Sequence, residues 1–428
     1  MREISGIHPI AKRNIRKTKP ICIIFLVSFI MKQPVFGQNP EHNQKNDSSV
    51  DRASNVRHQM DLIDIGYRII GKNPEMRFDS TWKKPVRLHI SGSPTPAYSL
   101  TTGFAANVAG NIAFYLSHDL DGNISSILIS PIYTQKMQII VPIQTSIWTK
   151  GNKYYAYGDW RFLKYPEKTY GLGGYTSASD ATALDYDYFR FYQFFLRKLK
   201  NNIYGGIGYE FEDHWNIKEL NVPAGTHTDF DKYGFSPKSV SSGFALNILL
   251  DTRRNSINPE GGFYGNMVFR QNLVALASDH NSETLLIDLR KYFRVSHNSN
   301  NTLCFWSYNW LTLSGNPPYL DLPSNGWDTY SNTGRGYAQS RFRSKSMVDL
   351  EGEFRFGILN NGLLGGVVFG NAESYSEISK NRFEVIEPAI GAGIRIKFNK
   401  FSKTNICIDY AFGKGGSNGI FTNLGEVF

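Results

Sequence analysis

The stretch SMVDLEGEFRFGIL, residues 346–359, alternates apolar and charged side chains along most of its length. The apolar positions are Val348, Leu350, Phe354, Phe356 and Ile358, and the charged ones are Asp349, Glu351, Glu353 and Arg355. A period of two is typical of a β-strand, because successive side chains point to opposite faces of a sheet. The stretch therefore predicts a strand with one apolar face and one face that carries charges of both signs.

The same pattern returns in LLIDLRKYFRV (285–295), IGAGIRIKF (390–398) and TNICIDYAF (404–412). A β-sandwich would turn its polar face to bulk water and would usually have shorter strands. An aromatic-rich face opposite paired charges instead favours a barrel wall, with lipid outside and a polar lumen inside. Lipid also demands that the sheet close, since every backbone N–H and C=O needs a partner there. We therefore predict an all-β fold, an antiparallel transmembrane β-barrel.

The number of strands follows from the spacing of the alternating segments. Fifteen such spans can be placed from residue 104 to residue 428, among them 363–371, 387–399 and 418–428, and residues 86–100 supply one more. Bacterial single-chain barrels have even strand numbers, with short turns in the periplasm and long loops outside. We therefore predict 16 strands within residues 85–428.

The first 37 residues have the composition of an export signal. A basic start precedes the short apolar run ICIIFLVSFI (21–30), and Val35 and Gly37 fit a cleavage site after residue 37. Their removal takes away seven basic residues and one acidic residue, so the net charge falls from +10 to about +4. Nucleic-acid binding thereby loses its main support. No apolar run is long enough for a transmembrane helix, and we expect export to a Gram-negative outer membrane.

Residues 38–84 form a polar linker that contains a short amphipathic helix. Met60, Ile63, Tyr67 and Ile70 have helical spacing, and Gly71 and Pro74 end the pattern, which predicts a periplasmic helix over 56–73. The helix is interpreted as a lumen plug, a surface helix or a partner-binding element, and the sequence does not choose between these.

The sequence has few features that indicate a catalytic or metal-binding site. Cys304 and Cys407 lack metal-ligand spacing, no nucleophile elbow, metal helix or phosphate loop is present, and no cofactor or metal is expected. Asp251, Arg253 and Asn255 have the spacing of one strand face near a turn. A network that fixes the turn is preferred there over a catalytic cluster. We do not expect an enzyme.

A glycine-flanked arginine lies in YSNTGRGYAQSRFRSK, residues 330–345. Gly334 and Gly336 allow the backbone beside Arg335 to turn tightly. The loop that contains it is long, which is typical of functional or disordered segments. A solvated basic loop is one interpretation, and an arginine that reaches a fixed carboxylate elsewhere in the molecule is the other.

Four segments, taken in order, resemble the bacterial surface antigen family of BamA and TamA assembly barrels. They are YPEKTYGLGG (165–174), LLDTRRNSINPEGGFY (249–264), GRGYAQSRFRSKSMVDLEGEFRF (334–356) and IDYAFGKGGSNGIFTNLGEVF (408–428). The resemblance covers about residues 85–428. It implies a loop that folds into the barrel, with Arg335, Gly336 and Tyr337 at its tip and Phe428 as the C-terminal signal.

The resemblance also implies wall partners for the loop arginine. The candidates are Asp349, Glu353, Arg355, Asn371 and Glu373. Asn371 stands where the family has an aspartate, and residues 38–84 are too few for a polypeptide-transport (POTRA) domain. The implied function is assembly or translocation of outer-membrane or envelope cargo, and the alternative is a passive channel or structural barrel. Implied partners are outer-membrane lipid, lipopolysaccharide, unfolded barrel substrates and envelope proteins.

Overall fold

The computed structural model describes residues 56, 58–77, 88–116, 123–223, 225–234, 236–295, 301–378 and 382–428. The predicted signal peptide, residues 1–37, lies outside these residues, as does much of the predicted linker. Among the described residues, no helix is both long and apolar enough to span a membrane.

Eighteen strand segments make up most of the described chain. The first nine are β1 (Leu88–Ser99), β2 (Gly103–Phe114), β3 (Ser125–Ile129), β4 (Ile132–Thr134), β5 (Ile139–Trp148), β6 (Tyr154–Lys164), β7 (Glu167–Thr169), β8 (Thr182–Lys200) and β9 (Ile203–Leu220). The others are β10 (Lys238–Asp251), β11 (Gly262–Asn272), β12 (Ser282–Arg294), β13 (Thr302–Gly315), β14 (Ser346–Gly357), β15 (Leu364–Glu377), β16 (Arg382–Asn399), β17 (Thr404–Gly413) and β18 (Asn418–Leu424).

Short helices precede the first strand or connect later ones. They are α3 (Leu62–Ile69), α5 (Asp229–Gly234), η1 (Lys150–Asn152), η2 (Ala178–Asp180), η3 (Val274–Leu276), η4 (Tyr319–Asp321) and η5 (Lys414–Gly416).

The segments form one antiparallel meander of sixteen traversals. β3 and β4 both pair with β2 and β5, so together they make one traversal. β6 and β7 likewise both pair with β8. Counting each of these pairs once leaves sixteen traversals in the described chain, the number that the sequence predicts, and the antiparallel all-β fold is confirmed.

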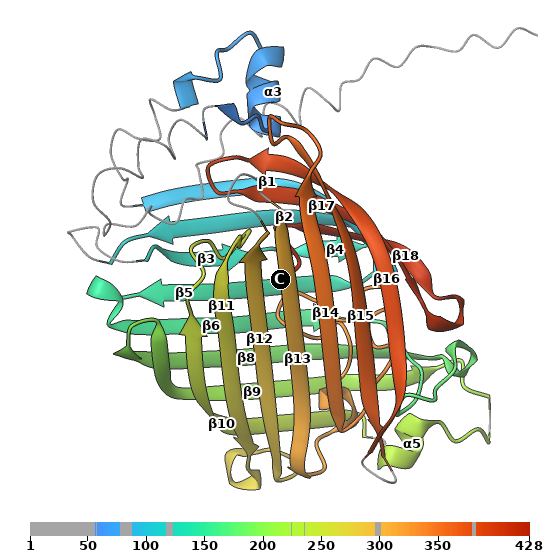
Figure 1. The fold of residues 1–428 in the computed structure, drawn as a ribbon. Helices are drawn as coiled ribbons and strands as arrows, with labels where there is room; N and C mark the ends of the chain where they lie inside the picture. The colour runs from blue at the N-terminus through green and yellow to red at the C-terminus, as the bar shows by residue number, and fades with distance from the viewer. Residues whose placement is uncertain are drawn as a thin grey trace, which may run out of the picture.

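The sheet rolls round on itself, so that its first and last strands come together (Figure 1). Thr422 Oγ1 on β18 accepts a hydrogen bond from the Tyr98 backbone N–H on β1 and donates one to the Tyr98 carbonyl, both at 3.1 Å. Within the described residues no backbone ladder joins these two strands. We call this contact the seam.

Alternation along each strand sorts the side chains between the two faces. On β14, Asp349, Glu351, Glu353 and Arg355 are all buried on the inner face, whereas Leu350 is 54% exposed on the outer face. The apolar positions of the strand thus lie on the outer face, which is the arrangement typical of a barrel wall that faces lipid. The interior is therefore the charged face, as the sequence predicts.

Three predicted boundaries are wrong. β15 continues to Glu377 rather than residue 371, and β16 begins at Arg382 rather than residue 387, because the two strands extend each other's ladder. β18 ends at Leu424, and residues 425–428 leave the sheet instead of completing the predicted strand. Gly425 turns the chain with a φ of 98°, a conformation that favours glycine.

Helix α3 is shorter than the predicted 56–73 and docks at the end of the barrel that has the short turns (Figure 1). Asp61 caps its N-terminus through a capping box with Asp64. Lys400, in the β16–β17 turn, donates its backbone N–H to Asp61 and pairs with Asp64 at 2.8 Å. Arg77 bonds both carboxylates, at 2.6 and 2.5 Å. This buried cluster attaches the helix to the outside of the barrel end.

Candidate functional site: a luminal loop and its charge network

The connection between β13 and β14, residues 316–345, folds into the barrel, and most of its side chains are buried. Arg335 at its tip is 2% exposed. Its guanidinium pairs with Glu351 and Glu353 on β14 and with Asp409 Oδ2 on β17, the last at 2.6 Å. It also lies 3.6 Å from the centre of the Phe369 ring. A solvated basic loop is therefore not what the chain forms here.

The glycines beside Arg335 bring the loop backbone against the wall. Gly336 has a φ of 113°, and a Cβ there would lie 2.6 Å from the Ala389 Cβ. Its carbonyl accepts a 2.7 Å hydrogen bond from the Ser417 hydroxyl. Tyr337 follows, donating its hydroxyl to the Pro388 carbonyl at 2.8 Å and accepting from the Lys414 backbone N–H at 2.9 Å. A side chain at position 336 would force the tip away from the wall.

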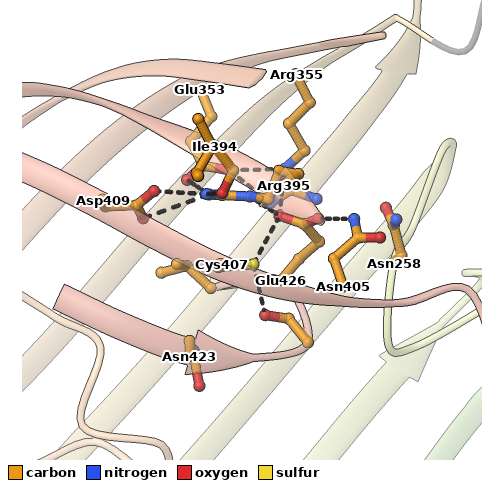
Figure 2. A network of polar contacts seen from close by, with 12 residues as sticks. Asn258, Glu353, Arg355, Ile394, Arg395, Asn405, Cys407, Asp409, Asn423 and Glu426 are labelled. Atoms are coloured by element: carbon orange, nitrogen blue, oxygen red, sulfur yellow. Dashed lines mark hydrogen bonds and ion pairs between the residues drawn. The ribbon is translucent and has the colours of Figure 1, made fainter. Parts of the chain in front are cut away.

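Arg335 joins a larger set of interior charges, which we call the luminal charge network. Figure 2 shows the part of it around Arg395, Asp409 and Glu426. Its members are Arg335, Glu351, Glu353, Arg355, Arg395, Asp409 and Glu426. Arg395 on β16 bonds Asp409 at 2.5 Å and Glu426 at 2.8 Å. Arg355 bonds Glu353 at 2.6 Å. The network thus ties the loop tip to three strands and to the segment after β18.

Of the five predicted wall partners, Glu353 binds the loop guanidinium, whereas Asp349, Arg355, Asn371 and Glu373 do not. Asn371 donates to the backbone carbonyl of Arg335 at 2.8 Å. Glu373 faces Asp349 across the β14–β15 ladder and accepts a hydrogen bond from the Tyr375 hydroxyl. Asn371 therefore holds the main chain of the loop, while the charge comes from other strands.

Asp409, Arg395 and Glu426 are members of the network that the sequence did not single out as partners. Asp409 and Arg395 lie at the alternate, charged positions of β17 and β16. The same alternation marks Glu353 and Arg355 on β14. Glu426 lies outside any strand, and no pattern marks it.

Residues 425–428 enter the interior beside the loop, and Figure 1 marks this end of the chain near the middle of the barrel. Phe428 is 3% exposed and lies 5.2 Å from the Trp306 ring. Arg355 donates to its carbonyl at 2.9 Å, and Asn332 of the loop donates to the Val427 carbonyl at 2.7 Å. The terminal segment and the loop therefore pack as one interior unit. The prediction that Phe428 is a C-terminal signal stays a prediction.

A second set of contacts fixes the base of the loop. Arg343 is fully buried, donates to the Leu320 carbonyl at 2.8 Å and lies 3.6 Å from Glu167. Its backbone carbonyl accepts from the Gly173 N–H at 2.9 Å. Segment 165–174 therefore packs against the loop, although the two are far apart in sequence.

Asp251, Arg253 and Asn255 lie at the turn between β10 and β11. Arg253 bonds Asp251 at 2.8 Å, and Asn255 donates to the Ser402 carbonyl at 3.2 Å. Glu260 bonds Lys403 at 2.6 Å and also pairs with Arg294. The three residues therefore belong to a network that docks this turn on the β16–β17 turn.

One arrangement among the described interior residues resembles catalytic chemistry. His214 Nδ1 on β9 lies 3.3 Å from Asp321 Oδ1, and the Ser241 hydroxyl donates to the other oxygen of Asp321 at 2.5 Å. The serine therefore faces the acid rather than the imidazole, and both His214 and Asp321 are buried. Burial, and then the Glu212 carboxylate, raise the pKa of Asp321 to about 8. This geometry anchors the loop and does not activate a nucleophile.

Within the described ranges, no group of three or more His, Cys, Asp or Glu side chains is placed to hold a metal ion. Cys304 and Cys407 are both buried free thiols.

The fold and the site together define a class: a large antiparallel barrel whose lumen is occupied by one of its own loops. Three solved structures share this fold. BamA from Haemophilus ducreyi lacking POTRA domains 1–3 aligns with a TM-score of 0.54 and 13% identity, over 80% of this chain and 71% of its own. CdiB from Acinetobacter baumannii gives 0.51 and 10%, and CdiB from Escherichia coli gives 0.55 and 9%.

Each CdiB alignment covers 80% of this chain but only 60% and 63%, respectively, of the CdiB chains. No protein-family model matches the sequence, and no curated protein matches it either. At these low identities the similarity establishes a common fold, of the BamA and CdiB barrel type.

Proposed function

We propose that the chain is an outer-membrane barrel that assembles or translocates protein cargo of the envelope, with the seam between β1 and β18 as its gate. The observation that carries the proposal is the seam itself. The hydrogen bonds that the structure describes across the seam join the Thr422 side chain to the Tyr98 backbone, whereas neighbouring strands elsewhere are joined by backbone ladders. An edge strand with free backbone groups can template an incoming strand.

The luminal loop supplies a latch for this gate. Arg335 holds Asp409 on β17, and through Arg395 the same network reaches Glu426, two residues after β18 ends. Asn423 of β18 also donates its side-chain N–H to the Asn332 side-chain oxygen of the loop, at 3.1 Å. Release of the loop would therefore free both the end of β18 and the segment that follows it.

The proposed orientation places α3 and the short turns in the periplasm, since outer-membrane barrels have their short turns on that side. Export by the predicted signal peptide accords with this orientation. The proposed partners are outer-membrane lipid and lipopolysaccharide around the wall, and unfolded barrel substrates or envelope proteins at the seam.

Depletion of the protein, followed by quantification of the outer-membrane proteome, tests the function. Loss of other barrels is expected, and unchanged levels of all of them would overturn the proposal. Complementation with the double variant Tyr98→Cys/Thr422→Cys, oxidised across the seam, is expected to fail, and reduction is expected to restore it. The matched control is Phe191→Cys/Phe211→Cys, a directly paired position of the β8–β9 ladder, which should complement in both states.

A passive channel is the second candidate, and the interior charges of both signs favour it. A polar lumen conducts solutes only where its plug leaves room. Planar-bilayer recordings of the wild type and of Arg335→Ala distinguish the two. A stable, solute-selective conductance in the wild type would support the channel, whereas a closed wild type and an open variant would support the latch.

A further inference from the structure

A groove of about 420 Å³ lies where β11, β12, β13 and β14 run side by side. Side chains of its apolar outer lining include Phe263, Leu289, Phe305 and Leu350. Leu289, Phe305 and Leu350 are 40%, 47% and 54% exposed, which places them on the outer face of the wall. The groove therefore opens on the outer face of the wall, although the inner-face residues Arg290, Trp306 and Glu351 also contribute to its lining.

The groove exists because small residues interrupt a row of large ones. Gly352 lies directly opposite Phe305 in the β13–β14 ladder, and Ser307 lies opposite Leu350. A Cβ added at Gly352 would meet the Phe305 ring at 3.7 Å and the Cys304 carbonyl oxygen at 4.0 Å, both ordinary contact distances. The position is thus empty of side chain although the backbone would tolerate one.

A cation stands at the edge of this apolar surface. Lys291 lies between Phe263 and Phe305 in the same cross-strand row that leads to Gly352. Its ammonium group lies over the Phe293 ring, 5.1 Å from the centroid. In the described part of the chain no carboxylate is within ion-pair distance of it.

The depth of Lys291 in the wall indicates what faces it. It is three residues from the end of β12, at the end of the barrel where α3 and the short turns lie. Three residues of a tilted strand span less than about 10 Å along the barrel axis. A lysine at that depth keeps its ammonium at headgroup level while its stem lies along apolar surface.

We propose that this groove binds one glycerophospholipid of the periplasmic leaflet, with an acyl chain lying over Gly352 and the phosphate paired with Lys291. Charge complementarity and the level of the cation select this occupant. The inference rests on the proposed membrane location of the barrel, but it does not depend on what the seam does.

Native mass spectrometry of the full chain with 1-palmitoyl-2-oleoylphosphatidylglycerol tests the site. The wild type should retain one lipid, and Lys291→Gln and Gly352→Leu should each bind it about tenfold more weakly. The first variant removes the cation and the second fills the groove. The matched controls are Lys200→Gln, an exposed cation beside the β8–β9 turn, and Ala392→Leu, on the outer face of β16, and both should bind as the wild type does.

Two further lipids test which chemical group of the lipid the groove recognises and from which leaflet the lipid comes. Dioleoylglycerol, which lacks the phosphate, should bind the wild type and Lys291→Gln equally weakly. Lipid A bound more tightly than the phospholipid would overturn the assignment to the periplasmic leaflet. Equal phospholipid binding by the wild type and both groove variants would overturn the site, and so would the absence of a retained lipid.

Insertion into vesicles separates this inference from the proposed function. A chain that inserts but retains no lipid contradicts the groove alone. A chain that fails to insert into vesicles of outer-membrane lipid contradicts the membrane location, and both proposals fail with it.

Discussion

The β8–β9 hairpin and the β1–β18 seam are opposite extremes of one wall. The hairpin ladder runs from Ala183↔Leu220 to Lys200↔Ile203, and its inner face is braced by Arg190 and Glu212, 3.1 Å apart. The seam has the hydrogen bonds between Tyr98 and Thr422. Backbone ladders make up most of what holds a strand in place, so the wall should open first at the seam.

Ion pairs distinguish the two regions further. The hairpin pairs connect strands of the wall, since Glu212 also bonds Arg270 of β11 at 2.9 Å. Near the seam, Asp409 shares its two oxygens between Arg395 of the wall and Arg335 of the loop. The order of the seam region therefore depends on contacts from the loop, whereas the hairpin is braced by the strands of the wall.

Removal of the Arg335 side chain should have the largest effect on the difference in stability between the seam and the β8–β9 hairpin. Arg335→Ala leaves Glu351, Glu353 and Asp409 buried with less compensating charge, and breaking such pairs costs about 3–5 kcal/mol. The free energy of unfolding in urea, measured in lipid vesicles, should fall by that amount. Hydrogen exchange should accelerate in β17 and β18 and stay unchanged in β8 and β9.

Arg341→Ala is the control, because Arg341 bonds Thr176 rather than a carboxylate. Its effect on unfolding should be clearly smaller. Equal exchange rates at the seam in the wild type and in Arg335→Ala would contradict the latch.

The helix cluster should give the next largest effect. Asp64→Asn removes the charge that Lys400 and Arg77 share, and a buried hydrogen bond to a charged group contributes about 1.5–3 kcal/mol. Proteolysis within α3 should become faster while the barrel stays folded. Asp231→Asn, on the exposed α5, is the control and should leave the cleavage rate unchanged. Cleavage of α3 at the wild-type rate would show that the cluster does not hold the helix.

A side chain added at Gly336, at the loop tip, should lower the free energy of unfolding by less than the changes above. Gly336→Ala combines a φ of 113° with a close approach to Ala389, for an expected loss of about 1–3 kcal/mol. Gly415→Ala shares a positive φ but meets nothing within 4 Å, so it should cost only about 1 kcal/mol. Urea unfolding of the two variants separates steric approach from backbone strain. Equal losses would mean that the tip does not press against the wall.

The ion pairs of Glu260 with Lys403 and Arg294 should have the smallest effect on the free energy of unfolding, and that effect should depend on pH. Burial raises the pKa of Glu260, but Lys403 and Arg294 outweigh it and hold that pKa below the ordinary value. Because the pKa of Glu260 is lower in the folded chain than in the unfolded chain, its ionised form stabilises the fold at pH values above the unfolded-state pKa, near 4.5. This stabilisation is lost as the pH falls through the folded-state pKa. Glu260→Gln should therefore lower stability by less than about 1 kcal/mol at pH 7, since both cations are partly exposed.

Unfolding measured at pH 7 and near pH 3 checks this sign. The difference between Glu260→Gln and the wild type should shrink at the lower pH. A difference that grows on acidification would contradict the assignment.

Much of the fold was predictable because alternation is a local property. The parity of Asp349, Glu353 and Arg355 on β14 assigns them to one face whatever their neighbours are, and the even strand count follows from spacing and closure. Strand ends were less predictable. β15 and β16 extend each other through cross-strand pairing, and such pairing leaves little trace in either strand alone.

By itself, the sequence determined the strand parity, the sixteen traversals and the presence of an arginine loop flanked by glycines. Only the tertiary structure decided which carboxylates meet Arg335. The side chains of Asp349 and Asp409 both lie on the inner face of the barrel, but of the two only Asp409 contacts the Arg335 guanidinium. The curvature of the wall and the path of the loop set these distances. The inward turn of residues 425–428 was decided in the same way, since Phe428 and Glu426 gain their partners from strands far away in the chain.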